Sequence, residues 1–266
     1  MNDGYDRVAI VTGADSGIGK ATAVALAEQG FDVGITYHTD QEGAEETARL
    51  IRGLGRAPAV RGHDLTDPVR AAAVVDELAE ELGGLGVLVN NAGTGSHEPL
   101  LEMDYERWRS VLAVDLDGPF LCAQRAARRM VAAGRGGRVV NVTSVHEEYP
   151  KVGSGPYCAA KGGLRLLSRV LALELADHGI TVNTVAPGEI ATPMTGQEDV
   201  PPQTGSRPGN PIPRPGDARE VAAVVAFLAG PTASYVTGAT VFVDGGMTLM
   251  GPQGASALGT GDWRAI

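Results

Sequence analysis

A tyrosine and a lysine stand four residues apart, at Tyr157 and Lys161, where a strongly apolar helical pattern begins. Side chains at this spacing share one face of a helix. An ammonium group favours the phenolate form of a nearby phenol, and such a tyrosine can give a proton to a carbonyl oxygen or take one from an alcohol. The hydroxyl of Ser144, just after a predicted strand, could steady the oxygen on which charge develops. The tyrosine-lysine spacing alone is a weak signal, because such pairs usually form a solvated helix face.

A glycine-rich segment at residues 12–19 (TGADSGIG) follows the first predicted strand and opens a helix. Glycine allows a tight turn and a close approach of the backbone to a pyrophosphate, and the amides at a helix N-terminus attract its charge. The spacing is G-x-x-x-G-x-G and differs from the G-x-G-x-x-G dinucleotide fingerprint. A strand-helix turn that binds nothing is the alternative interpretation.

The elements that must position these residues alternate between short β-rich runs and longer helical patterns. Gly30 and Gly179 follow predicted helices as stop signals, and Asp67-Pro68 reads as an N-cap with a first-turn proline. This alternation predicts a Rossmann-type α/β fold, with a doubly wound parallel sheet of about seven strands and helices on both faces. The predicted strands are Val8–Val11, Val33–Tyr37, Ala57–Arg61, Val87–Val89, Val139–Val142, Thr181–Val185 and Thr240–Val243.

The chain of 266 residues is interpreted as one dinucleotide-binding and catalytic domain, residues 1–266. Residues 192–216, with seven prolines and four glycines, interrupt the alternation. Because they follow the carboxyl end of a strand, a substrate lid is favoured over a surface insert. The tail at 251–266 is Gly-rich and carries Trp263, so it is expected either to fray or to pack on a partner subunit.

Composition excludes several classes of function. The formal net charge of -10 opposes nucleic-acid binding. No apolar stretch approaches the length of a membrane span, and no signal-like segment opens the sequence. The two cysteines, Cys122 and Cys158, fall in helical patterns and suit reduced thiols in a cytoplasmic protein. The five histidines lack metal-ligand spacing, so no metal site is expected.

These motifs together resemble the short-chain dehydrogenase/reductase family. Its marks occur in order and span nearly the whole chain: the glycine loop 12–19, Asp64-Leu65, the turn at residues 90–93 (NNAG), Ser144, Tyr157 with Lys161, Pro187-Gly188 with Thr192, and a last strand ending in residues 241–246 (VFVDGG).

The resemblance implies an NAD(P)(H)-dependent oxidoreductase that moves a hydride reversibly between the nicotinamide and a ketone or secondary alcohol. Ser144, Tyr157 and Lys161 would be catalytic, and Lys161 would also contact the nicotinamide ribose. Asp64 would meet the adenine amine and Asn90 would line the cofactor, although both residues could instead be turn or cap residues. The residues expected to bind the cofactor are Gly13, Asp15, Ser16, Gly17, Ile18, Gly19, Tyr37, His38, Asp64, Leu65, Asn91, Ala92, Gly93, Tyr157, Lys161, Pro187, Gly188, Ile190 and Thr192.

One catalytic position departs from the family pattern. The family usually has an asparagine where this chain has Asp115, and the main-chain carbonyl of that residue holds a water connecting the lysine to solvent. Pro119, four residues later, has no amide hydrogen, so it should free that carbonyl and kink the helix. We therefore expect the relay to survive the substitution through the backbone of Asp115, with Pro119 as a simple packing kink as the alternative.

The residue at the end of the second predicted strand bears on the cofactor preference, because NAD-specific relatives carry an acidic residue there. Tyr37, His38 and Thr39 stand there, so no acid repels a 2'-phosphate and no Arg or Lys binds one. Asp15 in the glycine loop disfavours a phosphate. The sequence leans to NADP(H) and leaves NAD(H) open.

The expected substrate contacts are His146 and Tyr149 after Ser144, with Met194 in the lid; a surface histidine is the alternative for His146. Residues 31–44, 143–147 and 186–194 resemble bacterial reductases of diacetyl and acetoin, and also sugar and 3-oxoacyl reductases. A catalytically weak dinucleotide-binding regulator is the competing class. By resemblance, a homotetramer or homodimer is expected, with the helices carrying Asp115 and Tyr157 in the interface.

Overall fold

The computed structural model describes residues 4–197, 201–207 and 210–250. Seven parallel strands form one sheet in the order β3-β2-β1-β4-β5-β6-β7. This order reverses between β1 and β4, which is the switch point at which open α/β sheets bind ligands. The strands are β1 (Val8–Val11), β2 (Asp32–Tyr37), β3 (Pro58–Gly62), β4 (Val87–Asn90), β5 (Gly137–Val142), β6 (Ile180–Pro187) and β7 (Thr240–Val243).

The predicted fold class is confirmed, and the predicted strands differ from the observed ones by one or two residues at their ends. β5 begins at Gly137 and β6 continues to Pro187, because pairing with neighbouring strands extends both beyond their apolar runs. β1 and β7 have the predicted bounds.

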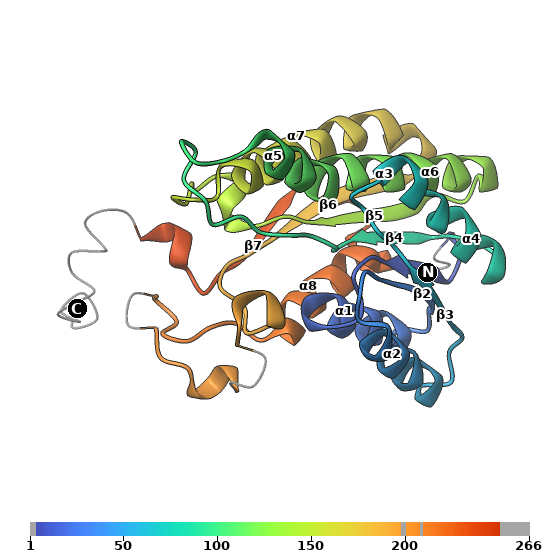
Figure 1. The fold of residues 1–266 in the computed structure, drawn as a ribbon. Helices are drawn as coiled ribbons and strands as arrows, with labels where there is room; N and C mark the ends of the chain where they lie inside the picture. Colours follow the sequence, from blue (N-terminus) through green and yellow to red (C-terminus); the bar gives the residue numbers. More distant parts are fainter. Residues whose placement is uncertain (1–3, 198–200, 208–209, 251–266) are drawn as a thin grey trace.

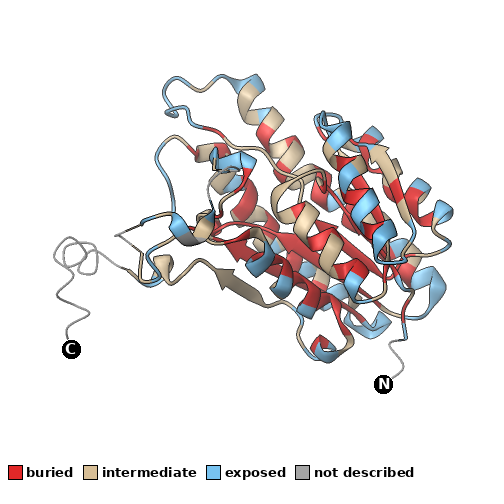
Figure 2. Cartoon of the chain, turned by 90° about the horizontal axis from the view of Figure 1, so that it is seen from below, coloured by how far each residue is buried: buried red, intermediate tan, exposed pale blue. Residues whose placement is uncertain are grey.

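Helices cover both faces of the sheet, as Figure 1 shows. The first core packs α1 (Gly17–Glu28), α2 (Gln41–Gly53) and α8 (Ala218–Ala229) against one face. The second core packs α3 (Pro68–Ala71), α4 (Ala73–Glu81), α6 (Gly118–Ala133) and α7 (Gly155–Leu175) against the other. The sheet between them is largely buried except at its two edge strands, β3 and β7 (Figure 2), so its central strands form the platform for the loops that follow them.

Local signals explain where the helices begin. Asp67 caps α3 by accepting a hydrogen bond from the Arg70 amide, with Pro68 in the first turn, as predicted. The α5 helix (Tyr105–Leu112) runs into α6 through a π-helical turn at Ala113–Asp117. The irregularity predicted from Pro119 is therefore a π-helical turn rather than a simple kink.

The segment predicted to be a lid begins after β6 and is partly described. Short 3-10 turns occur at Pro193–Thr195 and Pro202–Thr204, and Ile190 bridges Gly216 in parallel fashion. The ends of the segment are thus drawn together. The predicted tail at 251–266 lies outside the described residues. Among the described helices, none has the length and apolar character needed to cross a membrane.

Candidate active site

A cleft of about 290 Å³ lies along the carboxyl ends of the strands. Parallel strands deliver all their following loops to this edge, so residues distant in sequence meet there. The residues proposed from the sequence that line it are Gly13, Asp15, Ser16, Gly17, Ile18, Gly19, Tyr37, His38, Asn91, Ala92, Gly93, Ser144, Tyr157, Lys161, Pro187, Gly188, Ile190, Thr192 and Met194.

The glycine loop between β1 and α1 is fixed by the loop after β4. The side chain of Asn91 donates to the carbonyls of Thr12 and Gly13 at 2.9 and 2.8 Å. A Cβ on Gly19 would come within 2.0 Å of the Gly13 carbonyl oxygen, so only glycine permits this approach. Gly13 and Gly17 have φ of 62° and 51°, which favours glycine there too. The loop thus needs glycine at all three positions.

This loop fits the phosphates of a dinucleotide. Ser16 is the N-cap of α1, but its side chain makes no cap hydrogen bond; its hydroxyl donates to Asp15 at 3.2 Å instead. The first amides of α1 therefore keep donors for an anion, aided by the helix dipole. At the β2–β3 end of the cleft, the Nε2 atom of His63 is buried and has no hydrogen-bond partner among the residues that the structure describes, which leaves a polar atom for a ligand.

At the other end of the cleft, Lys161 is held from several sides. Its Nζ lies 3.1 Å from Oδ1 of Asp115, donates to the Val142 carbonyl at 3.3 Å, and sits 5.5 Å from the centre of the Tyr157 ring. Burial raises the pKa of Asp115 and by itself would lower that of Lys161, but the attraction to Asp115 and Tyr157 raises the pKa of Lys161 overall. The proton therefore stays on the lysine.

Asp115 lies beneath the cleft rather than in its lining, and its side chain is fully buried. The π-helical turn presents its carboxylate to Lys161 and to the amide of Thr94, which is 3.2 Å from both carboxylate oxygens. A Cβ on Gly93 would lie 2.7 Å from Oδ1, so glycine is needed there as well. The sequence reasoning assigned a role only to the backbone of Asp115 and missed this side-chain ion pair.

Ser144 follows β5 and faces the cleft. Its Oγ accepts from the amide of His146 at 3.1 Å, and among the described residues its own proton has no acceptor. The hydroxyl can therefore donate to a ligand oxygen beside Tyr157. Both residues line the same cleft, so it offers two hydroxyl donors for a ligand oxygen.

Of the three predicted substrate contacts, one lines the cleft and two do not. Met194 lines the cleft and is 62% exposed. His146 and Tyr149 stand just outside the lining; the His146 ring is edge-on to Tyr157, with ring centres 6.3 Å apart. Nδ1 of His146 lies 2.8 Å from the Tyr149 carbonyl oxygen. Since a carbonyl oxygen only accepts, Nδ1 must donate.

Three residues with an expected cofactor role lie outside the lining. Asp64 is exposed and accepts from the amide and hydroxyl of Thr66 at 2.9 and 2.7 Å, which lowers its pKa. Leu65 is buried in the second core. Asn90 donates to Asn141 and to the Pro119 carbonyl at 2.8 and 3.1 Å. Asp64 and Asn90 thus both have hydrogen-bond partners within the protein, and a cofactor role for them stays a prediction.

The cleft also has lining residues that the sequence reasoning did not assign. They share no motif, since they come from strand ends and the lid, and only the three-dimensional pairing brings them together. They are Thr36, Thr39, His63, Val142, Thr143, Pro193 and Thr195.

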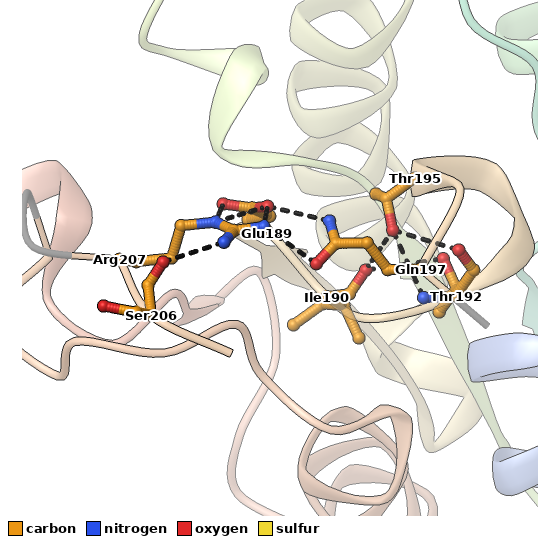
Figure 3. A network of polar contacts seen from close by, with 7 residues as sticks. All are labelled: Glu189, Ile190, Thr192, Thr195, Gln197, Ser206 and Arg207. Atoms are coloured by element: carbon orange, nitrogen blue, oxygen red, sulfur yellow. Dashed lines mark hydrogen bonds and ion pairs between the residues drawn. The ribbon is translucent and has the colours of Figure 1, made fainter. Parts of the chain in front are cut away.

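The segment predicted to be a lid is tied to the residues just after β6 by a polar network drawn in Figure 3. Arg207 forms an ion pair with Glu189, with its Nε 2.8 Å from both carboxylate oxygens. Gln197 bridges the pair, donating to Glu189 at 2.8 Å and accepting from Arg207 at 2.9 Å. Thr195 donates to the carbonyl of Ile190 at 2.7 Å. These contacts hold the described part of the lid beside the cleft.

Glu147, next to the site, is a second residue that sequence reasoning missed. Its side chain is fully buried, and neither carboxylate oxygen has a hydrogen-bond partner among the described residues. Burial raises the pKa of this carboxyl, with Arg165 at 3.7 Å as a partial counter-charge. No group of three or more potential metal ligands occurs in the described part of the chain.

Comparisons with known proteins agree with this geometry. A family model described as enoyl-(acyl carrier protein) reductase matches residues 13–248. The uncharacterized oxidoreductase YohF of Escherichia coli K12 is 47% identical over 247 residues, which are 93% of this chain and 98% of the relative. The acetoin dehydrogenase YohF of Salmonella typhimurium superimposes with a TM-score of 0.89 at 47% identity, over 94% of this chain and 98% of that one. The acetoin dehydrogenase of Enterobacter cloacae gives 0.88 at 49% identity, over 92% and 97%.

Proposed function

The chain belongs to the short-chain dehydrogenase/reductase family and is an NAD(P)-dependent oxidoreductase acting on CH–OH groups, and we propose that its substrates are small α-hydroxyketones and diketones of the acetoin and diacetyl type. The observation that carries this proposal is the presence of Ser144, Tyr157 and Lys161 in the lining of one cleft, with the Lys161 ammonium beside the Tyr157 ring, together with the likeness to two acetoin dehydrogenases.

In the proposed mechanism, the bound nicotinamide supplies or accepts the hydride. The phenol of Tyr157 donates the proton to the carbonyl oxygen in reduction and takes it back in oxidation. Ser144 donates a hydrogen bond to that same oxygen and stabilises the charge that develops on it. Binding both donors to one oxygen also orients the carbonyl carbon.

Lys161 acts on the tyrosine and the cofactor through a limited set of donors. An ammonium group has three N–H donors. Two are directed at Asp115 and at the Val142 carbonyl. The third remains for the cleft, where it can hold a ribose hydroxyl, and the ammonium lies 5.5 Å from the centre of the Tyr157 ring.

An α-hydroxyketone, with a hydroxyl beside the reacting carbonyl, fits the proposed role of His146. Because Nδ1 donates to the Tyr149 carbonyl, Nε2 of the neutral imidazole is an acceptor. A hydroxyl next to the reacting carbonyl can donate to it, whereas a simple ketone cannot. Met194 would supply an apolar wall for the methyl groups.

Two further properties are proposed with this function. NADP(H) is favoured over NAD(H), since Tyr37 and His38 line the cleft at the end of β2 without an acidic neighbour in the lining on that strand. A homotetramer or homodimer is supported by Leu166, Val170 and Leu173, which are 62, 43 and 82% exposed along one face of α7. A cytoplasmic location is consistent with two free cysteines.

The test follows NADPH and NADH at 340 nm, measuring their oxidation with acetoin, diacetyl and butanone and their formation from NADP⁺ and NAD⁺ with glucose. Wild type is expected to consume NADPH faster than NADH, and Tyr157→Phe to lose at least about 100-fold in kcat. His146→Phe is expected to raise KM for acetoin and leave that for butanone unchanged. Equal rates for wild type and Tyr157→Phe would contradict the mechanism and favour a catalytically weak binding protein.

A further inference from the structure

His63 occupies the end of the cleft opposite Tyr157. It follows β3, and its amide donates to the carbonyl of Tyr37 at the end of β2, at 2.7 Å. The residue is 6% exposed, yet its side chain lines the cleft. It is therefore a fixed part of the cleft wall rather than a surface histidine.

The ring of His63 is joined to the glycine loop through one hydroxyl. Thr36 Oγ1 accepts from the Gly13 amide at 3.1 Å and lies 3.1 Å from Nδ1 of His63. The threonine hydroxyl has one proton, and Nδ1 is its acceptor among the described residues. If Nδ1 instead donated, that hydroxyl proton would be left without an acceptor there. The neighbours thus select the tautomer that carries its proton on Nε2.

Nothing in the described protein accepts that proton. Burial lowers the pKa of His63 to about 4, so the ring is neutral at physiological pH and keeps a single N–H. Nε2 is buried and without a partner. Buried donors in folded proteins are almost always satisfied, and this one borders a ligand cleft, so a ligand acceptor is the missing partner.

The strand order tells which half of the dinucleotide passes His63. Proton and hydride must reach the same carbonyl group, so the nicotinamide lies beside Tyr157, past the end of β5. The glycine loop after β1 takes the phosphates. β2 lies three strand spacings from β5, about 14 Å. The adenosine half must therefore extend over the ends of β2 and β3, where His63 is found.

We propose that His63 binds the adenosine half of the cofactor by donating a hydrogen bond from Nε2 to an adenine nitrogen or a ribose oxygen. The hydrogen bond to Thr36 orients the His63 ring and connects it to the Gly13 amide. The residue that would contact the adenosine and the loop that would hold the phosphates therefore belong to one chain of hydrogen bonds. This inference rests on dinucleotide use by the family and not on the substrate proposed above.

The test measures binding to the full chain by calorimetry, with 5'-AMP, ribose 5-phosphate, nicotinamide mononucleotide and NADPH as ligands. His63→Leu removes the donor, and His63→Gln keeps an amide donor of similar reach. We expect about a tenfold weaker Kd for 5'-AMP and NADPH in His63→Leu, near-normal values in His63→Gln, and unchanged binding of nicotinamide mononucleotide. A loss shared by ribose 5-phosphate would assign the acceptor to the ribose, and a loss confined to the two adenine-containing ligands, 5'-AMP and NADPH, would assign it to the adenine.

Unchanged 5'-AMP affinity in His63→Leu would overturn the proposal while leaving dinucleotide use intact. Failure of wild type to bind any of the four ligands would instead overturn dinucleotide use. If the His63→Leu variant does not fold, ¹⁵N spectra of the His63 imidazole in the wild-type protein test the proposal instead. The Nε2-protonated tautomer, with a resonance that moves on adding 5'-AMP, is expected; the Nδ1-protonated tautomer, or an Nε2 resonance that does not respond, refutes the inference.

Discussion

Replacing Asp115 with alanine tests the buried ion pair behind the proposed active site. The substitution leaves the Lys161 ammonium without its partner at 3.1 Å, in a place where only 4% of the lysine side chain is exposed. The Thr94 amide also loses its acceptor. The remaining contact of Lys161, with the Val142 carbonyl, carries no opposite charge. The folded state is therefore expected to lose stability while the unfolded state is unaffected.

The size of the loss follows from burial. Removing one member of a buried ion pair costs about 3–5 kcal/mol, because the other charge is left in a low-dielectric site. For a chain of this size, 1 kcal/mol lowers Tm by about 2–4 °C, so a fall of roughly 6–20 °C is expected. Asp115→Asn keeps an oxygen for Lys161 and for Thr94, so it should lose less and should change turnover only modestly.

The assay is urea unfolding of the ligand-free protein, followed by circular dichroism at one protein concentration. Asp117→Ala is the matched control, because Asp117 shares the π-helical turn but is only partly buried; it should stay within about 0.5 kcal/mol of wild type. Adding Lys161→Met to Asp115→Ala should recover stability. The reasoning is refuted if Asp115→Ala loses under 1 kcal/mol, or if the double variant is no more stable than Asp115→Ala.

Two more predictions concern Glu147 and the glycine loop. Because burial raises the pKa of Glu147, the folded protein holds the carboxyl proton more tightly than the unfolded chain does. The unfolding free energy of wild type therefore falls as pH rises from the carboxyl's pKa in the unfolded chain to its higher pKa in the folded protein. Glu147→Gln should therefore raise the unfolding free energy at pH 8 by about 1–3 kcal/mol, with a smaller gain at pH 5; no gain at pH 8 in urea unfolding would contradict this. Gly19→Ala would place a methyl 2.0 Å from the Gly13 carbonyl, so NADPH affinity measured by fluorescence should fall more than tenfold. Gly53→Ala, with nothing within 4 Å of the added carbon, is the control, and equal affinity in both variants would refute the steric argument.

Much of this architecture could be predicted because its signals are local in sequence. Strand-helix alternation and a glycine loop between the first strand and helix predict the sheet and the position of the cleft. Tyr157 and Lys161 are four residues apart and so share a helix face, and Pro119 predicts an irregular helix. Each of these follows from a few consecutive residues, so no knowledge of distant partners is needed.

The features that escaped prediction depend on partners far apart in the chain. The proposed role of His63 depends on its contact with Thr36, which in turn binds the glycine loop. No sequence spacing links these positions. The burial of Glu147 depends on how its turn packs against α7. A charged residue in a polar-looking segment is expected to be exposed, so the sequence alone could not single it out.

Asp115 connects the two groups of features, because a local signal produced a non-local contact. Pro119 cannot complete a regular helical hydrogen bond to the fourth residue before it. The chain responds with a π-helical turn at Ala113–Asp117, and the Asn90 side chain binds the Pro119 carbonyl. In a regular helix an aspartate would seldom be fully buried, whereas here the wider turn presents the carboxylate inward to Lys161. Pro119 and Asp115 therefore act together. The proline widens the helix, and the widened turn lets the Asp115 carboxylate bind Lys161 and fix it beside Tyr157.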